Sequence, residues 1–245
     1  MQAPAGGTEV PHRATLIEQH YDWYTDEDHA VWALLYERRM RELRQNGCEF
    51  FLRGARRIGL RPDRVPVLAE VNERLEPLTG WRAVPVSGFL PAAEFFHCLA
   101  ERRFPTTITV RPRAQLDYLE QPDIFHDVFG HVPLHADPVF ADFLQRFGAL
   151  ASAASTDAET EAMARLFWFT VEFGLIRERG HIKLYGSGLI SSAADAANAL
   201  SARCQHRPFT LEAVEAQPFE IDHLQDVLFV IESFEDLYEA LSRRQ

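Results

Sequence analysis

The segment FWFTVEFGLI, residues 167–176, restricts the possible folds more than any other part of this sequence. It is the most aromatic helix-like stretch of the chain, and its only charged residue is Glu172. Aromatic side chains at this density belong in a core. A glutamate is almost never fully buried alone, because removing a carboxylate from water costs several kcal/mol in order of magnitude. The fold must therefore bring a cation to Glu172, either an arginine such as Arg165, one or two helical turns earlier, or a metal ion.

Length and charge limit the class of protein. The chain has 245 residues, 47% hydrophobic and 25% charged, which is ordinary globular composition. Its length is near the upper limit for one hydrophobic core, so a single domain is expected. The net charge of −11 disfavours nucleic acid and anionic membranes as partners, because an acidic surface repels phosphate. The N-terminus lacks a secretory signal pattern and no stretch approaches the ~20 apolar residues of a membrane span.

Cysteine usage points to the cytoplasm. Cys48, Cys98 and Cys204 are odd in number and widely spaced, which favours reduced thiols over a disulfide framework.

The pattern of apolar residues predicts a mostly α-helical domain with a few short strands, an α+β fold. Residues 1–14 are rich in glycine, proline and polar groups and are expected to form a loose tail, with one domain over 15–245. Thr25 is expected to cap a helix that runs to about Leu43. Further helices are predicted over 65–75, 94–104, 122–129, 138–151, 158–177, 191–204 and, after a segment at 226–231, up to about 241. Strands are predicted over 106–110 and 182–185, with a turn over 186–188.

The densest group of chemically active residues is PDIFHDVFGHVP, residues 122–133. His126 and His131 are five residues apart and point about 140° apart on a continuous α-helix, so spacing alone does not make them co-ligands. Gly130 is a natural helix terminator, however, and beyond it His131 can fold back toward His126. Both histidines lie among apolar residues. A metal ion can satisfy them, and so can ordinary hydrogen bonds in the core.

Glu172 completes a possible metal site with the two histidines. Two histidines and one carboxylate form a facial triad that leaves three coordination positions open, which suits Fe(II) binding oxygen beside a co-substrate. Zinc hydrolases usually leave one open position and need a base near the bound water, and the zinc signature with histidines four apart is absent. On the residues alone, core histidines and a Glu172–Arg165 pair remain as alternatives.

Three long motifs show a resemblance to a known family. PDIFHDVFGHVP (122–133), WFTVEFGL (168–175) and IKLYGSGLISS (182–192) resemble the pterin-dependent aromatic amino acid hydroxylases, and the likeness extends from about Tyr21 to about Leu241. The resemblance implies a single catalytic domain of that family's type. It implies that His126, His131 and Glu172 bind one non-haem Fe(II). It also implies tetrahydrobiopterin, or a related tetrahydropterin, as cofactor and molecular oxygen as co-substrate.

The resemblance also assigns residues to the two binding pockets. It implies that Arg111 grips the substrate carboxylate, which suits a planar guanidinium, and that Phe95 stacks on the flat pterin ring. The other implied pterin contacts are Gly88, Phe89, Leu90, Ala92 and Asp127. The other implied substrate contacts are Leu119, Pro122, His126, Trp168, Gly188, Ser191 and Ile221. On the residues alone, Arg111 would be a surface arginine after a strand, and Ser191 is equally suited to cap the next helix.

Some positions depart from the family pattern. Asp127 stands where animal members carry glutamate, Ala92 replaces a serine, and Phe167 replaces a tyrosine found in several members. The alignment places Ile221 where tyrosine-using members carry an aspartate. An apolar side chain there favours a ring without a hydroxyl, because an unmatched buried hydroxyl costs roughly 1–3 kcal/mol.

The implied reaction is hydroxylation of L-phenylalanine to L-tyrosine. Tryptophan or tyrosine hydroxylation is the alternative within the family. A zinc-dependent hydrolase or a non-catalytic metal-binding module is the alternative from another class. Animal relatives add a regulatory domain and a tetramerisation helix, for which this length leaves no room, so a monomer without built-in allosteric control is expected.

Overall fold

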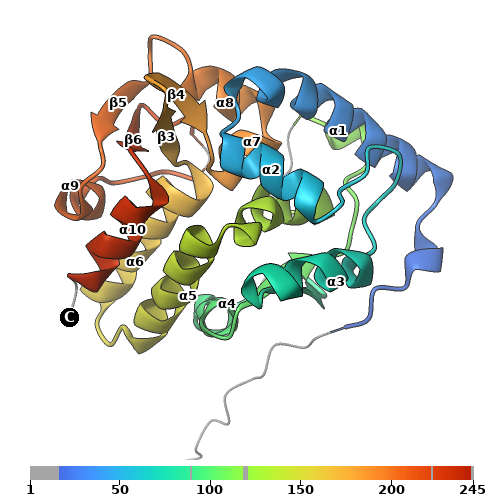
Figure 1. Ribbon diagram of the computed structural model, residues 1–245, viewed down its shortest axis with the longest axis horizontal. Coiled ribbons are helices and arrows are strands. Elements are labelled where there is room, and N and C mark those ends of the chain that lie inside the picture. Colours follow the sequence, from blue (N-terminus) through green and yellow to red (C-terminus); the bar gives the residue numbers. More distant parts are fainter. Residues whose placement is uncertain (1–16, 89, 118–120, 222, 244–245) are drawn as a thin grey trace, which may run out of the picture.

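The computed structural model describes residues 17–243 except 89, 118–120 and 222. Helices dominate the described chain and are joined by two small sheets, which confirms the predicted α+β class (Figure 1). The tail predicted over 1–14 lies outside the described residues. None of the described helices is long and apolar enough to cross a membrane.

The α-helices are α1 (Asp26–Asn46), α2 (Glu49–Arg57), α3 (Leu68–Thr79), α4 (Ala92–Ala100), α5 (Pro138–Ala153), α6 (Asp157–Phe167), α7 (Ser187–Ser191), α8 (Ala193–Ala199), α9 (Leu211–Ala216) and α10 (Phe234–Ser242). Two segments are π-helical, η3 (Phe125–His131) and η5 (Trp168–Glu172). Short 3-10 helices are η1 (Tyr21–Trp23), η2 (Arg113–Gln115) and η4 (Val132–Ala136).

The strands form two separate sheets. They are β1 (Arg82–Val86), β2 (Arg103–Thr107), β3 (Leu175–Glu178), β4 (His181–Leu184), β5 (Gln205–Pro208) and β6 (Val227–Ile231). β1 pairs with β2 in parallel, and the second sheet has the order β4-β3-β6-β5, in which only the β3–β4 pair is antiparallel. Figure 1 shows α5 running through the middle of the molecule, with α6 and α10 on one side and α3 and α4 on the other.

Helix starts follow their capping residues. Thr25 caps α1 in a reciprocal capping box with Asp28, as predicted. α3, however, continues through Pro77, where the sequence predicted a stop. Proline removes only its own hydrogen bond so close to the helix end, and Gly80, with φ of 76°, supplies the left-handed residue that ends the helix.

Several predicted helices extended too far. The 94–104 helix ends at Ala100, after which Arg102 has a positive φ of 56° and the chain enters β2. The strand predicted over 106–110 therefore begins three residues earlier. The 158–177 helix ends at Glu172 and is followed by β3.

The turn predicted over 186–188 is the start of α7, and α8 is shorter than the 191–204 helix, since β5 follows it. Ser192, not Ser191, caps α8.

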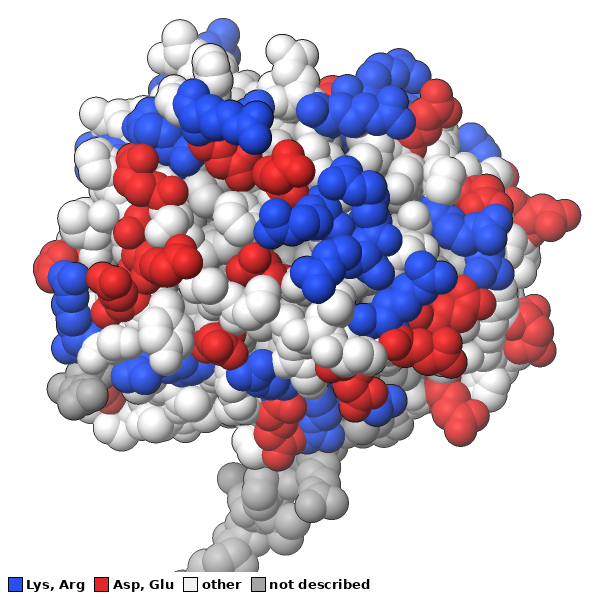
Figure 2. All heavy atoms as spheres, in the orientation of Figure 1, with Lys and Arg blue, Asp and Glu red and all other residues white. Residues whose placement is uncertain are grey.

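The surface carries mixed charge. Figure 2 shows acidic and basic side chains interspersed on the face seen in Figure 1, with basic side chains gathered over α2 and α3.

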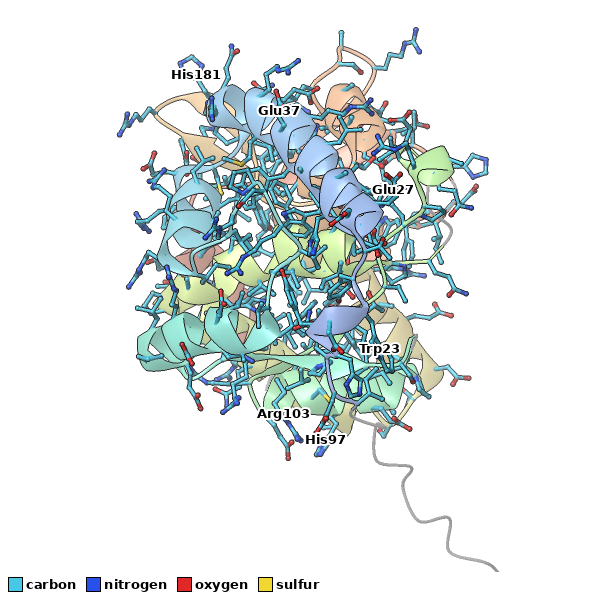
Figure 3. All side chains as sticks on the ribbon, turned by 90° about the vertical axis from the view of Figure 1, so that its right-hand side faces the viewer. Trp23, Glu27, Glu37, His97, Arg103 and His181 are labelled. Carbon is cyan, nitrogen blue, oxygen red and sulfur yellow. The ribbon has the colours of Figure 1, made fainter. Side chains whose placement is uncertain are left out.

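Figure 3 shows Trp23 near the beginning of the described chain, and this residue is 72% exposed. The three cysteines are buried and free.

The apolar core includes residues of the α-helices and also residues of the two π-helices, which carry His126, His131 and Glu172.

Candidate metal centre and substrate site

His126 and His131 face each other because the helix that carries them is a π-helix. Hydrogen bonding from i to i+5 brings residues five apart onto neighbouring positions of one face, which an α-helix does not do. Their Nε2 atoms are 3.2 Å apart. Gly130 lies inside η3, so the prediction that it ends the helix was wrong. A Cβ at Gly130 would lie 3.1 Å from the carbonyl oxygen of Ser187, so the glycine lets α7 pack closely against η3.

Glu172 is the last residue of the second π-helix, η5, and its carboxylate reaches both histidines. Its Oε1 is 3.2 Å from His131 Nε2, and its Oε2 is 3.7 Å from His126 Nε2. One ligand atom from each of the three residues lies within 4.8 Å of the others. Arg165 instead donates to the Glu215 carbonyl at 2.7 Å and pairs with Glu161, so the alternative Glu172–Arg165 pair is wrong.

The protonation of these groups suits metal binding. Burial raises the pKa of Glu172, but His131, His126 and the Ser187 hydroxyl outweigh it and lower that pKa to about 2. The Ser191 hydroxyl donates to the Ser187 carbonyl at 2.8 Å, so its oxygen is free to accept a bond from His126 Nδ1 at 2.9 Å. A proton on Nδ1 leaves the Nε2 lone pair directed at the other two ligands.

The donor set fits a divalent iron better than a hydrolytic zinc. Two imidazoles and one carboxylate on a single side form the facial arrangement typical of non-haem Fe(II). A zinc hydrolase needs a free base near the metal. The two nearest acids in the motif are both engaged, because Asp127 accepts from the backbone and hydroxyl of Thr107 and Asp123 is paired with Arg111.

Arg111 is buried, so the surface-arginine interpretation is wrong. Its side chain is 8% exposed and forms a two-pronged pair with Asp123, Nε to Oδ2 at 2.9 Å and Nη2 to Oδ1 at 2.8 Å. Its Nη1 donates to the Leu116 carbonyl at 3.3 Å. Asp123 also accepts the backbone N–H of His126 at 3.0 Å. This one carboxylate therefore links the predicted substrate arginine to the metal-binding helix.

Asp123 was missed by the sequence reasoning. Its signal was available, since an aspartate three residues before a helical residue is placed to accept a first-turn backbone N–H.

Phe95, which is predicted to stack on the pterin, is separated from the proposed metal site by one aromatic ring, that of Phe104. Phe95 packs edge-on against Phe104 at 6.0 Å, and Phe104 lies 4.7 Å from the His131 ring. Phe167 also packs edge-on against Phe95. Apart from its chain neighbours, no atom of the described residues would lie within 4 Å of a Cβ at Gly88.

The other predicted pterin contacts differ in their burial. Leu90 is half-buried and Ala92 is exposed. Burial raises the pKa of Asp127, and its bonds to Thr107 tie it to β2. Phe89 lies outside the described residues.

Of the predicted substrate contacts, Trp168 packs against other aromatic rings, but Ile221 does not. The Trp168 ring stacks on Phe219 at 4.7 Å and lies 4.6 Å from Phe173. Ile221 is 78% exposed, so the structure does not place it in an apolar wall and Phe219 is the residue of that segment that meets Trp168.

Other predicted substrate residues have different neighbours. Pro122 is exposed and its carbonyl accepts from Thr107. Gly188 is buried against the Phe173 ring and the Glu172 carbonyl. The alternative role of Ser191 as a helix cap is wrong, because its hydroxyl bonds His126. Leu119 lies outside the described residues.

Comparison with known proteins identifies the family. Residues 19–244 match the biopterin-dependent aromatic amino acid hydroxylases. The chain is 42% identical to phenylalanine-4-hydroxylase of Chromobacterium violaceum over 91% of this chain and 76% of that protein. Human tyrosine 3-monooxygenase is 38% identical over 89% of this chain and 42% of that protein.

A solved structure agrees with this assignment. The C. violaceum phenylalanine hydroxylase with bound iron(III) and 7,8-dihydrobiopterin has a TM-score of 0.90 and 42% identity, covering 94% of this chain and 84% of that one. Family match, sequence identity and structural likeness cover the same long stretch, which includes both π-helices. The chain therefore belongs to the biopterin-dependent aromatic amino acid hydroxylase family.

Proposed function

We propose that this protein hydroxylates L-phenylalanine to L-tyrosine, using molecular oxygen and a tetrahydropterin at a mononuclear non-haem Fe(II). The observation that carries the proposal is the convergence of His126, His131 and Glu172 from two π-helices to within 4.8 Å of one another. A relative with 42% identity holds iron and a biopterin in its solved structure.

The chain's own residues act by placement. When bound, iron and reduced pterin together supply the oxygen-binding position and the electrons that hydroxylation of an aromatic ring requires. Arg111, held by Asp123, binds the substrate carboxylate and so fixes the distance of the ring from the metal. The stacked Trp168 and Phe219 exclude water from the ring side, and Phe95 offers an aromatic face to the pterin.

The choice of phenylalanine rests on the relatives. The exposed Ile221 gives no support to the expected apolar contact at the para position. Phenylalanine-4-hydroxylase of C. violaceum is more similar and is covered over a larger share of its length than the tyrosine 3-monooxygenase. Phenylalanine is therefore favoured over tyrosine as the substrate.

A product assay with all three aromatic amino acids tests the proposal. Iron-loaded protein with tetrahydropterin and oxygen is expected to make tyrosine from phenylalanine, and to make none when iron, pterin or oxygen is withheld. A protein that makes no hydroxylated product under full conditions contradicts the proposal. Hydrolytic activity without pterin or oxygen would favour the zinc alternative, and metal binding without either activity would favour a binding module.

We also propose that the protein acts as a monomer in the cytoplasm. Three buried, free cysteines support a reducing compartment. The exposed large apolar residues among those described are few and lie in four separate segments of the chain, Trp23, Leu200, Ile221 with Leu224, and Tyr238. Sedimentation equilibrium is expected to give a mass near 28.0 kDa, and a multiple of that mass would contradict the monomer.

A further inference from the structure

Ser187, the first residue of α7, touches the Glu172 carboxylate from the side away from the histidine contact at Oε1. Its hydroxyl donates to Glu172 Oε2 at 2.6 Å, while Oε1 is the oxygen that faces His131 Nε2 at 3.2 Å. Ser187 is 1% exposed, so water does not compete for this bond. Oε2 also lies 3.7 Å from His126 Nε2, so the two carboxylate oxygens face different histidines and only Oε2 accepts the Ser187 bond.

The two glycines beside Ser187 make this contact possible. A Cβ at Gly186 would lie 2.4 Å from the Glu172 carbonyl oxygen and 2.4 Å from the Gly174 nitrogen. A Cβ at Gly188 would lie 2.9 Å from the Phe173 ring and 3.1 Å from the same Glu172 carbonyl oxygen. A Cβ at Gly186 would overlap backbone atoms, and one at Gly188 would be closer to its neighbours than side chains normally approach, so the two glycines let the α7 backbone lie against the end of η5.

The rest of α7 is held in place by buried bonds. Arg39 of α1 is 2% exposed and donates to the carbonyls of Leu189 and Ile190 at 2.9 and 2.8 Å. Gly130 of η3 packs against the Ser187 carbonyl from the other direction. Ser187 thus projects from a fixed support and not from a loop.

We propose that Ser187 is a positioning residue of the metal centre, whose hydroxyl holds Glu172 so that Oε1 is the oxygen left to bind the metal; this rests on the proposed function. The hydrogen bond from Ser187 makes Oε2 a weaker metal ligand, and it fixes the rotation of the carboxylate. Binding through one oxygen occupies a single coordination position. The coordination positions not taken by the three side chains would then remain available for oxygen.

The experiment compares metal binding by the full-length wild type, Ser187→Ala and Ser187→Thr. Fe(II) affinity is measured anaerobically by competition with a chelator, and the absorption spectrum of the Co(II)-loaded protein reports the ligand geometry. Loss of the hydroxyl in Ser187→Ala is expected to weaken Fe(II) binding by about 10–100-fold and to change the Co(II) spectrum. Ser187→Thr keeps the hydroxyl and is expected to match the wild type.

Thr170→Val is the matched control. Thr170 lies in the same π-helix as Glu172 and is fully buried, but its hydroxyl donates to the carbonyl of Leu166, four residues earlier in α6, and not to Glu172. Its removal is expected to leave metal affinity and spectrum unchanged. Thermal melts of the metal-free proteins show whether each variant is folded.

The outcomes separate the two proposals. Ser187→Ala that binds iron as tightly as the wild type, with the same Co(II) spectrum, overturns the role of Ser187 and leaves the proposed function intact. A folded Ser187→Thr as weak as Ser187→Ala also overturns it, because packing and not the hydroxyl would then be responsible. A wild-type protein that binds neither metal overturns the proposed function, and the role of Ser187 with it.

Discussion

Asp123 shows how a single side chain couples two parts of the site. Its carboxylate binds the Arg111 guanidinium with both oxygens and also accepts the backbone N–H of His126. The pair is buried, so each charge depends on the other for compensation. Asp123 therefore holds Arg111 in place and also anchors the start of η3, the helix that carries His126 and His131.

Replacement of Arg111 is expected to affect amino acid binding. Arg111→Ala removes a charge-assisted contact worth about 1.5–3 kcal/mol, which corresponds to a rise of roughly 10–100-fold in KM for phenylalanine. Steady-state kinetics of the iron-loaded protein measure this. Arg113→Ala is the control, because Arg113 is an exposed arginine two residues away that pairs with Glu27. An unchanged KM in Arg111→Ala would mean that this arginine does not hold the substrate.

The three proposed ligand residues could be named from the sequence, but their geometry could not. Five-residue spacing on an α-helix separates His126 from His131, so the sequence predicts their approach only if the helix ends at Gly130. The structure uses a π-helix instead, with Gly130 inside it. The glycine is explained by the approach of α7, a contact between segments more than fifty residues apart along the chain that no local pattern can indicate.

At the scale of elements, α7 supplies the hydrogen-bond partners of two of the proposed metal ligands, Ser191 for His126 and Ser187 for Glu172. Gly186→Ala places a methyl group against the backbone of residues 172 and 174, where no flexible side chain can move aside. We expect a loss of about 1–3 kcal/mol in the free energy of unfolding, because overpacking displaces α7, and weaker Fe(II) binding. Urea unfolding and the chelator competition measure the two effects.

Gly180→Ala is the control that separates a loss of stability from a loss of Fe(II) binding. Gly180 has a φ of 81° and open space around its Cβ position, so alanine there costs about 1–2 kcal/mol through backbone strain alone. Its Fe(II) affinity is expected to equal that of the wild type. If Gly186→Ala also retained wild-type affinity, close docking of α7 would not be needed for the metal site.

The short helix η4 buries an unusual histidine. His135 is fully buried between aromatic rings, and neither of its ring nitrogens has a hydrogen-bond partner within the described part of the chain. Burial, reinforced by the nearby His131, lowers the pKa of His135 well below its ordinary value of 6.5. The folded protein therefore keeps this imidazole neutral at a pH where the unfolded chain binds a proton.

His135 is expected to make the fold sensitive to acid. A lowered folded-state pKa means that the unfolded state binds more protons below pH 6.5, so stability falls as the pH falls below that value. For one proton this is about 1.4 kcal/mol per pH unit. Urea unfolding of chelator-treated protein at pH 7.5 and 5.5 should show a decrease about 1.4 kcal/mol larger for the wild type than for His135→Leu. Equal decreases would contradict the assignment.

For the whole molecule, helix starts with strong caps were predictable and sheet order was not. Thr25 caps α1 as predicted, and α5 starts at residue 138 as predicted, where the Asp137 side chain caps it. The order β4-β3-β6-β5, by contrast, pairs β3 with a strand about fifty residues later. The short strands carry little local signal, because tertiary pairing and not propensity selects them.

The metal itself should stabilise the whole fold, because its ligands come from two helices in different parts of the chain. A ligand that binds only the folded state at 100 times its Kd adds about 2.7 kcal/mol. In a domain of this size that corresponds to a rise of roughly 5–10 °C in Tm. Differential scanning calorimetry of metal-free protein, with and without Fe(II) under anaerobic conditions, measures the shift.

Glu172→Ala tests whether the rise in Tm comes from metal bound at the proposed site. This variant removes one of the three ligands and the burial cost of its carboxylate, so the metal-free protein is expected to fold while losing hydroxylation. Its Tm should rise far less than that of the wild type at the same Fe(II) concentration, because two imidazoles alone bind the metal more weakly. An equal rise in both proteins would place the stabilising metal elsewhere on the surface. A rise confined to the wild type instead ties the stability of the whole molecule to the same three side chains as its proposed activity.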